Sequence, residues 1–180
     1  MLRMLMLILC LLPAVAFARD WQVDAARSTL TFQGSYQGEV FEGRFKSFQA
    51  TIAYDPADLA QAKFDVSIDL ASVDTASAER DDTLKAGDFF ATDRFPTAHF
   101  VTESFAQAPD GSVTAHGKLT LRGHTQPVTL KVTFTPRGDD ATLDVTTSLE
   151  RSAFGLGTDS DWNDISAEIA VHGHLLLHAR

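Results

Sequence analysis

The stretch Phe64-Asp65-Val66-Ser67-Ile68-Asp69-Leu70 alternates apolar and polar side chains at every position. Because successive side chains of a β-strand point to opposite faces, this pattern predicts a strand with one apolar face and one polar, solvent-exposed face. The same period of two recurs at 113–122, 128–134 and 142–149. The sequence therefore predicts an all-β domain built on an antiparallel sheet.

Eight strands are predicted from this alternation, joined by short turns. Their ranges are 28–36, 43–54, 63–71, 97–105, 112–122, 127–135, 140–150 and 164–178. Turn-forming pairs such as Asp55-Pro56 and Gly123-His124 lie between them, and such links favour hairpins over parallel βαβ units. In the second range the apolar parity changes near Lys46-Ser47, which predicts a β-bulge at that point.

The segment 72–96 departs from the alternation. Its residues 77–86 are rich in side chains that favour helix caps and first turns, so a short helix is predicted there. The loop Gly87-Asp88-Phe89-Phe90 follows. Two adjacent phenylalanine side chains in a loop must be shielded from water by other residues. The helix and loop are therefore expected to form a lid over one end of the sheet.

An eight-stranded antiparallel sheet loses its exposed edges when it closes into a barrel. A barrel of this size is either filled by its own side chains or holds one small ligand. The alternation alone leaves both interiors open. The composition of 13 Phe against two Tyr and two Trp modestly favours a lipid cavity, because Phe fills space without needing a hydrogen-bond partner.

The candidate ligand-binding residues share an apolar side chain and lie on the predicted inward face, in the lid or in the loop before the last strand. An interior with no ionisable group can accept a hydrocarbon but not a charge. The candidates are Leu30, Phe32, Phe45, Ile52, Phe64, Val66, Ile68, Phe89, Phe90, Phe100, Leu119, Leu130, Val132, Phe134, Val145, Phe154, Ile169 and Val171.

Residues 1–18 are predicted to be a cleaved export signal. Arg3 supplies the basic start, residues 5–12 are apolar, and Ala16-Phe17-Ala18 is a small-x-small cleavage site. The apolar run is shorter than the roughly 18 residues that a membrane span needs. Residues 19–180 are then expected to form one periplasmic domain. The single cysteine, Cys10, lies in the signal, which excludes disulfides and thiolate chemistry from the mature chain.

Several function classes are disfavoured by the remaining residues. A formal net charge of −9 repels phosphate backbones, so nucleic acid is not an expected partner. The chain lacks a Gly-x-Ser-x-Gly elbow, a His-Glu-x-x-His motif and a phosphate loop, so no catalytic residues are predicted. His172, His174 and His178 share one strand face, but the opposite face is the apolar one, so these side chains should point to solvent and no metal site is predicted.

Five motifs along the chain resemble those of one family, in the family's order. They are Trp21 to Phe32, Gly43 to Phe48, Arg80 to Pro96, Gly117 to Thr125 and Arg151 to Leu156. Together they are similar to the YceI-like family of periplasmic polyisoprenoid-binding proteins. The resemblance implies a lipocalin-like, eight-stranded barrel whose tunnel holds an isoprenoid chain, and it shifts the interpretation from a packed core to a ligand cavity.

The function implied is a non-catalytic carrier of a polyprenyl phosphate, a quinone or a related lipid, with no other cofactor. Tyr36, Arg80 and Arg151 are the candidate head-group contacts. Arg27, Tyr36 and Thr83 stand where the family often has histidine, which leaves the head-group chemistry open. Transient membrane contact for loading is expected, and monomer and dimer both stay open. The alternatives are a periplasmic hydrolase that uses Asp and His near the mouth, and a filled-core interaction module in stress response.

Overall fold

The computed structural model describes residues 19–180, so the predicted export signal lies outside the described residues. These described residues form 11 strands. Their bounds are β1 (Asp20–Val23), β2 (Thr29–Tyr36), β3 (Glu39–Phe45), β4 (Phe48–Ala53), β5 (Lys63–Asp69), β6 (Val73–Asp74), β7 (Thr97–Gln107), β8 (Val113–Leu121), β9 (His124–Arg137), β10 (Asp140–Glu150) and β11 (Glu168–Ala179).

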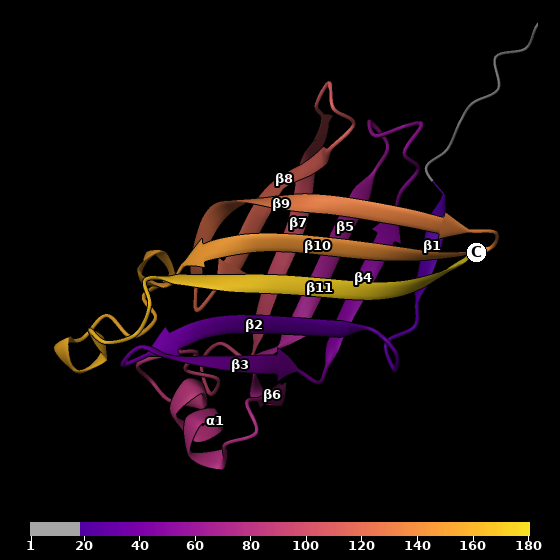
Figure 1. Ribbon diagram of the computed structural model, residues 1–180. Coiled ribbons are helices and arrows are strands. Elements are labelled where there is room, and N and C mark those ends of the chain that lie inside the picture. The colour runs from indigo at the N-terminus through magenta and orange to yellow at the C-terminus, as the bar shows by residue number, and fades with distance from the viewer. Residues whose placement is uncertain (1–18) are drawn as a thin grey trace, which may run out of the picture.

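Eight of these strands close into an antiparallel barrel, which confirms the predicted fold class. They are hydrogen-bonded in the order β1–β4–β5–β7–β8–β9–β10–β11, and β11 pairs back with β1 (Figure 1). The strands β2, β3 and β6 extend the sheet from the beginning of β11.

The strand predicted at 28–36 is β2, and the short strand β1 that precedes it was not predicted. The strand β11 pairs with β2 through Ala170–His174 and with β1 through Leu177–Ala179, so β1 and β2 follow one another along it. The strand predicted at 43–54 is β3 followed by β4. The parity change at Lys46-Ser47 is a break rather than a bulge, because the N–H groups of these two residues donate to the backbone oxygen and Oγ of Ser72 instead of to a strand.

The predicted helix is present as α1 (Ala78–Lys85), and Ser77 caps it by accepting a hydrogen bond from the Arg80 N–H. The carboxylate of Asp81 accepts hydrogen bonds from the N–H and hydroxyl of Thr75, which holds α1 beside β6 (Figure 1). Short 3₁₀ helices are η1 (Leu70–Ser72), η2 (Arg151–Phe154) and η3 (Ser160–Trp162). Within residues 19–180, no helix has the length and apolar character to cross a membrane.

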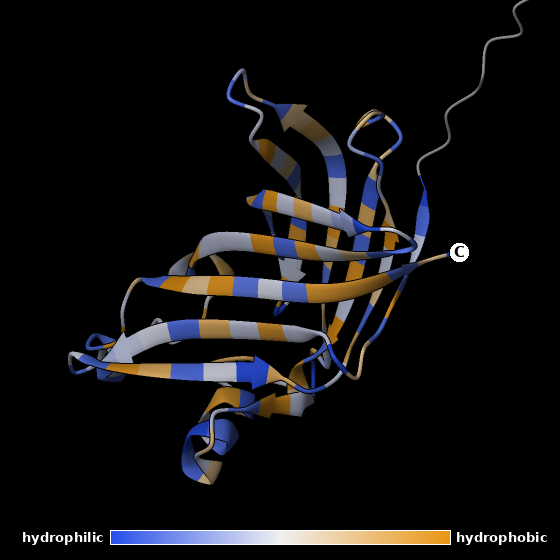
Figure 2. Ribbon diagram, turned by 45° about the vertical axis from the view of Figure 1, so that its right-hand side comes forward, coloured by the Kyte–Doolittle hydropathy of each residue, from blue (hydrophilic) through white to orange (hydrophobic). Residues whose placement is uncertain are grey.

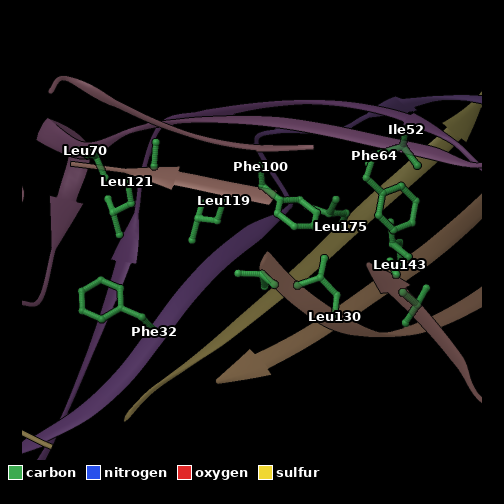
Figure 3. Packing of buried hydrophobic residues seen from close by; sticks show 14 of the residues in the cluster. Phe32, Ile52, Phe64, Leu70, Phe100, Leu119, Leu121, Leu130, Leu143 and Leu175 are labelled. Atoms are coloured by element: carbon green, nitrogen blue, oxygen red, sulfur yellow. The ribbon is translucent and has the colours of Figure 1, made fainter. Parts of the chain in front are cut away.

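The alternation along the strands separates the inside of the barrel from the outside (Figure 2). On β9, Val128, Leu130 and Val132 are buried, whereas Lys131 between them is exposed. The predicted parity is confirmed here. Figure 3 shows how the buried side chains follow one another through the interior, from Phe32 and Leu121 to Phe64 and Leu143.

One end of the interior is filled by aromatic rings. Tyr54 contacts Phe64, Phe105 and Phe134 with ring centroids 4.9–5.9 Å apart, and Trp21 lies edge-on to Phe134. We call these five residues the aromatic plug. The indole N–H of Trp21 donates to the backbone oxygen of Tyr54 at 2.9 Å, so the plug is held by polar as well as apolar contacts. The barrel interior is therefore solid at the end where β1 meets the end of β11.

Candidate functional site

The opposite end of the barrel contains a cavity of about 520 Å³. It lies between the inner faces of β2, β3 and β11, the helix α1 and the loops that follow α1 and β10. This volume is within the range of about 300–1,000 Å³ that is typical of small-molecule sites. The cavity is therefore large enough to hold a ligand.

The wall of the cavity is mostly hydrocarbon. Its apolar members come from the strands, from α1 and from both loops, and they are Phe32, Phe41, Phe45, Leu84, Phe89, Phe90, Leu121, Leu149, Phe154, Leu156, Trp162, Ile165, Ile169 and Val171. Such a wall favours an apolar ligand by burial alone. It offers no preformed site for a charge in the interior.

The polar side chains on the wall are Tyr36, Ser77, Glu79, Arg80, Thr83 and Arg151. Tyr36 is 41% exposed, and Glu79 and Arg80 are also exposed, so these groups mark the mouth. The Arg80 guanidinium stacks 5.3 Å from the centre of the Phe41 ring and reaches the Thr75 backbone oxygen at 3.5 Å. Its remaining donors can turn toward a ligand head group at the mouth.

Arg151 has a different role from Arg80. Its Nε donates to the Ser166 oxygen at 3.1 Å, its Nη1 to the oxygens of Leu156 and Gly157, and its Nη2 to those of Trp162 and Ile165. Every N–H group of the guanidinium is therefore used by the loop 156–166. The side chain organises the loop that forms this part of the mouth, and these contacts leave no guanidinium donor for the head-group contact that the sequence predicted.

The predicted lid loop is packed into the mouth. Phe89 and Phe90 are buried, and the Phe89 ring is edge-on to Trp162 with centroids 4.9 Å apart. The carboxylate of Asp88 accepts a hydrogen bond from the indole N–H of Trp162 at 3.1 Å, and its backbone oxygen accepts one from the Gly157 N–H at 2.7 Å. The lid and the loop after β10 thus together form one side of the mouth.

A third contact joins the same two loops. The guanidinium of Arg122, at the end of β8, donates to the backbone oxygens of Gly87 and Gly155. All three residues lie in the part of the chain that matches a known family. The sequence profile of the YceI-like domain matches residues 21–176. The chain belongs to the YceI-like family.

Individual relatives agree with this assignment. The chain is 32% identical over 170 residues to a UPF0312 protein of Vibrio vulnificus, covering 89% of this chain and 90% of that one. The crystal structure of BcnA from Burkholderia cenocepacia matches with a TM-score of 0.82 and 32% identity, over 86% of this chain and 99% of that one. A polyisoprenoid binding domain from Saccharophagus degradans matches with a TM-score of 0.69 over 92% of this chain and 100% of that one, and at 17% identity it supports the fold alone.

In this YceI-like domain some predicted lining residues line the cavity and others do not. Those on its wall are Phe32, Phe45, Phe89, Phe90, Phe154, Ile169 and Val171. Those outside the wall are Leu30, Ile52, Phe64, Val66, Ile68, Phe100, Leu119, Leu130, Val132, Phe134 and Val145. Alternation identifies the inward face of a strand, but it does not tell how far along the barrel the interior is filled.

Several wall residues were not among the predicted ones. Leu121 and Leu149 continue the inward parity of β8 and β10, so the alternation could have included them. Leu84, Leu156 and Trp162 lie in α1 and in the loop after β10. No period-two signal marks such positions, because their burial depends on contacts between segments far apart in the chain.

The three C-terminal histidines lie on the outside of the YceI-like barrel. His172 and His174 both contact the Asp144 carboxylate, at 3.2 and 2.7 Å, and His178 contacts Asp140 at 2.7 Å. Burial acts to raise the pKa of Asp144, but the hydrogen bonds from His174 and His172 outweigh it and lower that pKa. Within residues 19–180 there is no group of three or more His, Cys, Asp or Glu side chains arranged to hold a metal ion.

Proposed function

We propose that this protein is a periplasmic carrier that encloses the chain of an isoprenoid lipid and performs no catalysis. The observation that carries the proposal is the cavity of about 520 Å³ whose inner wall is hydrocarbon. Each buried methylene group contributes about 0.8 kcal/mol of gross transfer free energy. A chain of a few isoprene units is therefore retained by burial, without an ionic anchor.

The relatives support an isoprenoid rather than another apolar ligand. A neighbour of the same fold from Saccharophagus degradans is a polyisoprenoid binding domain, and the chain belongs to the same YceI-like family that the sequence motifs indicated. An isoprenoid chain also suits a wall of Phe, Leu, Ile and Val, because methyl branches fill the spaces between such side chains.

The mouth suits a polar head group. Arg80 and the Tyr36 hydroxyl lie on the cavity wall where it meets solvent. A guanidinium pairs well with a phosphate or a carbonyl oxygen. The proposal therefore places the head group beside Arg80 and the chain in the apolar interior, as in a polyprenyl phosphate or a quinone.

The Ser77 and Thr83 hydroxyl groups on the wall are engaged with the helix rather than set up as nucleophiles. The Ser77 oxygen accepts the Arg80 N–H as the cap of α1, and the Thr83 hydroxyl donates to the Glu79 backbone oxygen at 2.9 Å. A hydroxyl nucleophile needs a general base within hydrogen-bond reach, and these contacts are to backbone groups. They support a binding role.

Solvent extraction of the purified protein followed by mass spectrometry tests the proposal. We expect a stoichiometric isoprenoid from the wild type and none from Leu149→Asp, which places a carboxylate on the cavity wall. The matched control is Thr146→Asp on the outer, exposed side of the same strand, which should keep its lipid. Lipid-free wild-type protein, or equal loss in both variants when both are folded by circular dichroism, would overturn the proposal.

The proposed periplasmic location can be tested by a separate measurement. If residues 1–18 are an export signal, protein recovered from a periplasmic fraction has the mass of a chain beginning at Arg19. A full-length mass in the cytosolic fraction would contradict the periplasmic role.

A further inference from the structure

The cavity ends at one level on the paired strands β11 and β2. On β11, Ile169 and Val171 line it but Gly173 does not. On β2, Phe32 lines it but Leu30 does not. The register makes these two boundaries the same one, because Val171 is paired with Phe32 and Gly173 with Leu30.

The strand β10 repeats this boundary. On β10, Leu149 lines the cavity and Val145 does not, and Val145 is paired with Gly173. On β8, Leu121 lines it and Leu119 does not. The cavity therefore has a floor at the level of Phe32 and Val171.

The interior below this floor is filled. Phe100 and Leu119, which are paired across β7 and β8, are each 7% exposed and lie next after Leu121 in Figure 3. Leu143 further down is 0% exposed, and the aromatic plug occupies the far end. The site is thus a blind pocket with its mouth at α1, and a chain cannot pass through the barrel.

The volume of the pocket limits how many carbon atoms of a lipid chain it can enclose. An apolar protein cavity of about 150 Å³ accommodates benzene, which is about 25 Å³ for each carbon. At that density a cavity of about 520 Å³ encloses about 20 carbons, or about four isoprene units.

We infer that the floor made by Phe32 and Val171, backed by Phe100 and Leu119, limits the enclosed part of the ligand to about four isoprene units. A longer isoprenoid cannot have its whole chain enclosed while its head group lies beside Arg80, so it should bind less tightly than a four-unit one. This inference rests on the proposed function, because it assigns a chain length to the lipid proposed there. Phe100 is the specificity-determining residue beneath the floor, and its ring lies against Gly117.

The test offers delipidated protein an equimolar mixture of all-trans isoprenoid alcohols with two to nine units, and native mass spectrometry reads the bound lengths. The wild type should select the four-unit alcohol, geranylgeraniol. Phe100→Ala removes a six-carbon ring below the floor and should move the preferred length up by about one unit. Phe105→Ala, the same change within the aromatic plug, should leave it unchanged. Val171→Phe fills the pocket from its wall and should shorten the preferred length, which keeps the test valid if Phe100→Ala does not fold.

The outcomes separate the two proposals. Binding of the four-unit and nine-unit alcohols in equal amounts, or the same preferred length in the wild type, Phe100→Ala and Val171→Phe, would overturn the length limit alone. No bound alcohol of any length would overturn the proposed function together with it.

Discussion

Phe32 on β2 and Gly43 on β3 are directly paired across the sheet, and the Phe32 ring lies over the Gly43 backbone where a Cβ atom would overlap it. The absence of a side chain at Gly43 lets the ring lie flat against the wall. The ring therefore forms part of the pocket floor without filling the lumen above it.

Gly43→Ala should force the Phe32 ring toward the lumen. Overpacking of this kind costs about 1–3 kcal/mol of folding free energy, and the displaced ring would also reduce the amount of bound lipid. Urea unfolding and lipid extraction measure the two effects. Adding Phe32→Leu should restore part of both, because the smaller side chain leaves room for the methyl group introduced on β3.

Gly87→Ala is the matched control for this substitution. No heavy atom lies within 4 Å of a Cβ built at Gly87, so stability and lipid content should stay at the wild-type level. Equal behaviour of Gly43→Ala and Gly87→Ala would contradict the role assigned to the Phe32–Gly43 pair.

Arg151 should be needed for the loop rather than for the lipid head group. Replacing it by Met leaves five backbone oxygens of the loop 156–166 without their donor, so we expect a loss of about 3 kcal/mol in folding free energy. Arg151→Lys should recover little of it, since an ammonium group cannot reproduce the planar fork of a guanidinium.

Hydrogen exchange of the amides in 156–166, read beside urea unfolding, checks this assignment. Arg137→Met, at an exposed position on β9, is the control and should change neither measurement. Wild-type protection in Arg151→Lys would show that a positive charge alone suffices and would refute the loop-organising role.

The strand faces and the helix could be predicted from the sequence because they depend on local patterns. The parity of Val128, Leu130 and Val132 and the Ser77 cap of α1 need no knowledge of distant residues. The two-residue strand β6 could not be predicted, because two residues are too short to show a period. The level of the pocket floor depends on which side chains meet across strands, as Phe32 meets Gly43, and one sequence does not reveal that pairing.

Substitutions at neighbouring inner and outer positions of β9 should differ strongly in their effect on folding stability. Val132 is 8% exposed and lies between Val145 and Val113 in the register. Val132→Lys buries a charge among hydrocarbon and should prevent stable folding. Lys131→Val on the outer face should stay within about 0.5 kcal/mol of the wild type. Similar unfolding midpoints for the two variants would refute the assigned parity.

Arg80 should contribute to the binding affinity for the lipid head group and not to the affinity for the isoprenoid chain. The loss of a charge-assisted hydrogen bond costs about 1.5–3 kcal/mol, which is a decrease in affinity of about tenfold or more. We therefore expect Arg80→Met to weaken binding of a four-unit isoprenyl phosphate by that factor and to leave binding of the corresponding alcohol unchanged.

Lys85→Met removes a positive charge from the same helix at a position that pairs with Asp82. It is the matched control, because Lys85 is not on the cavity wall. A decrease of the same size for the phosphate in both variants would indicate long-range attraction by α1 instead of a contact from Arg80.

Tyr54 should make the stability of the barrel sensitive to alkaline pH. Burial, and then the negative charge of Asp55, raises the pKa of the Tyr54 hydroxyl above its ordinary value of 10.0. As the pH rises, the unfolded chain loses this proton before the folded one does. The stabilisation from neutral Tyr54 is therefore fully present below the ordinary pKa and is lost as the pH rises through the folded-state value.

Tyr54→Phe removes this titration, so the variant should lose less stability than the wild type between pH of about 9 and about 11. Urea unfolding across that range gives both slopes. Tyr36→Phe, at an exposed position on the mouth, is the control and should follow the wild type. If Tyr54→Phe also follows the wild-type slope, the plug tyrosine ionises as readily in the folded barrel as in the unfolded chain, and the interior at that end is open to water.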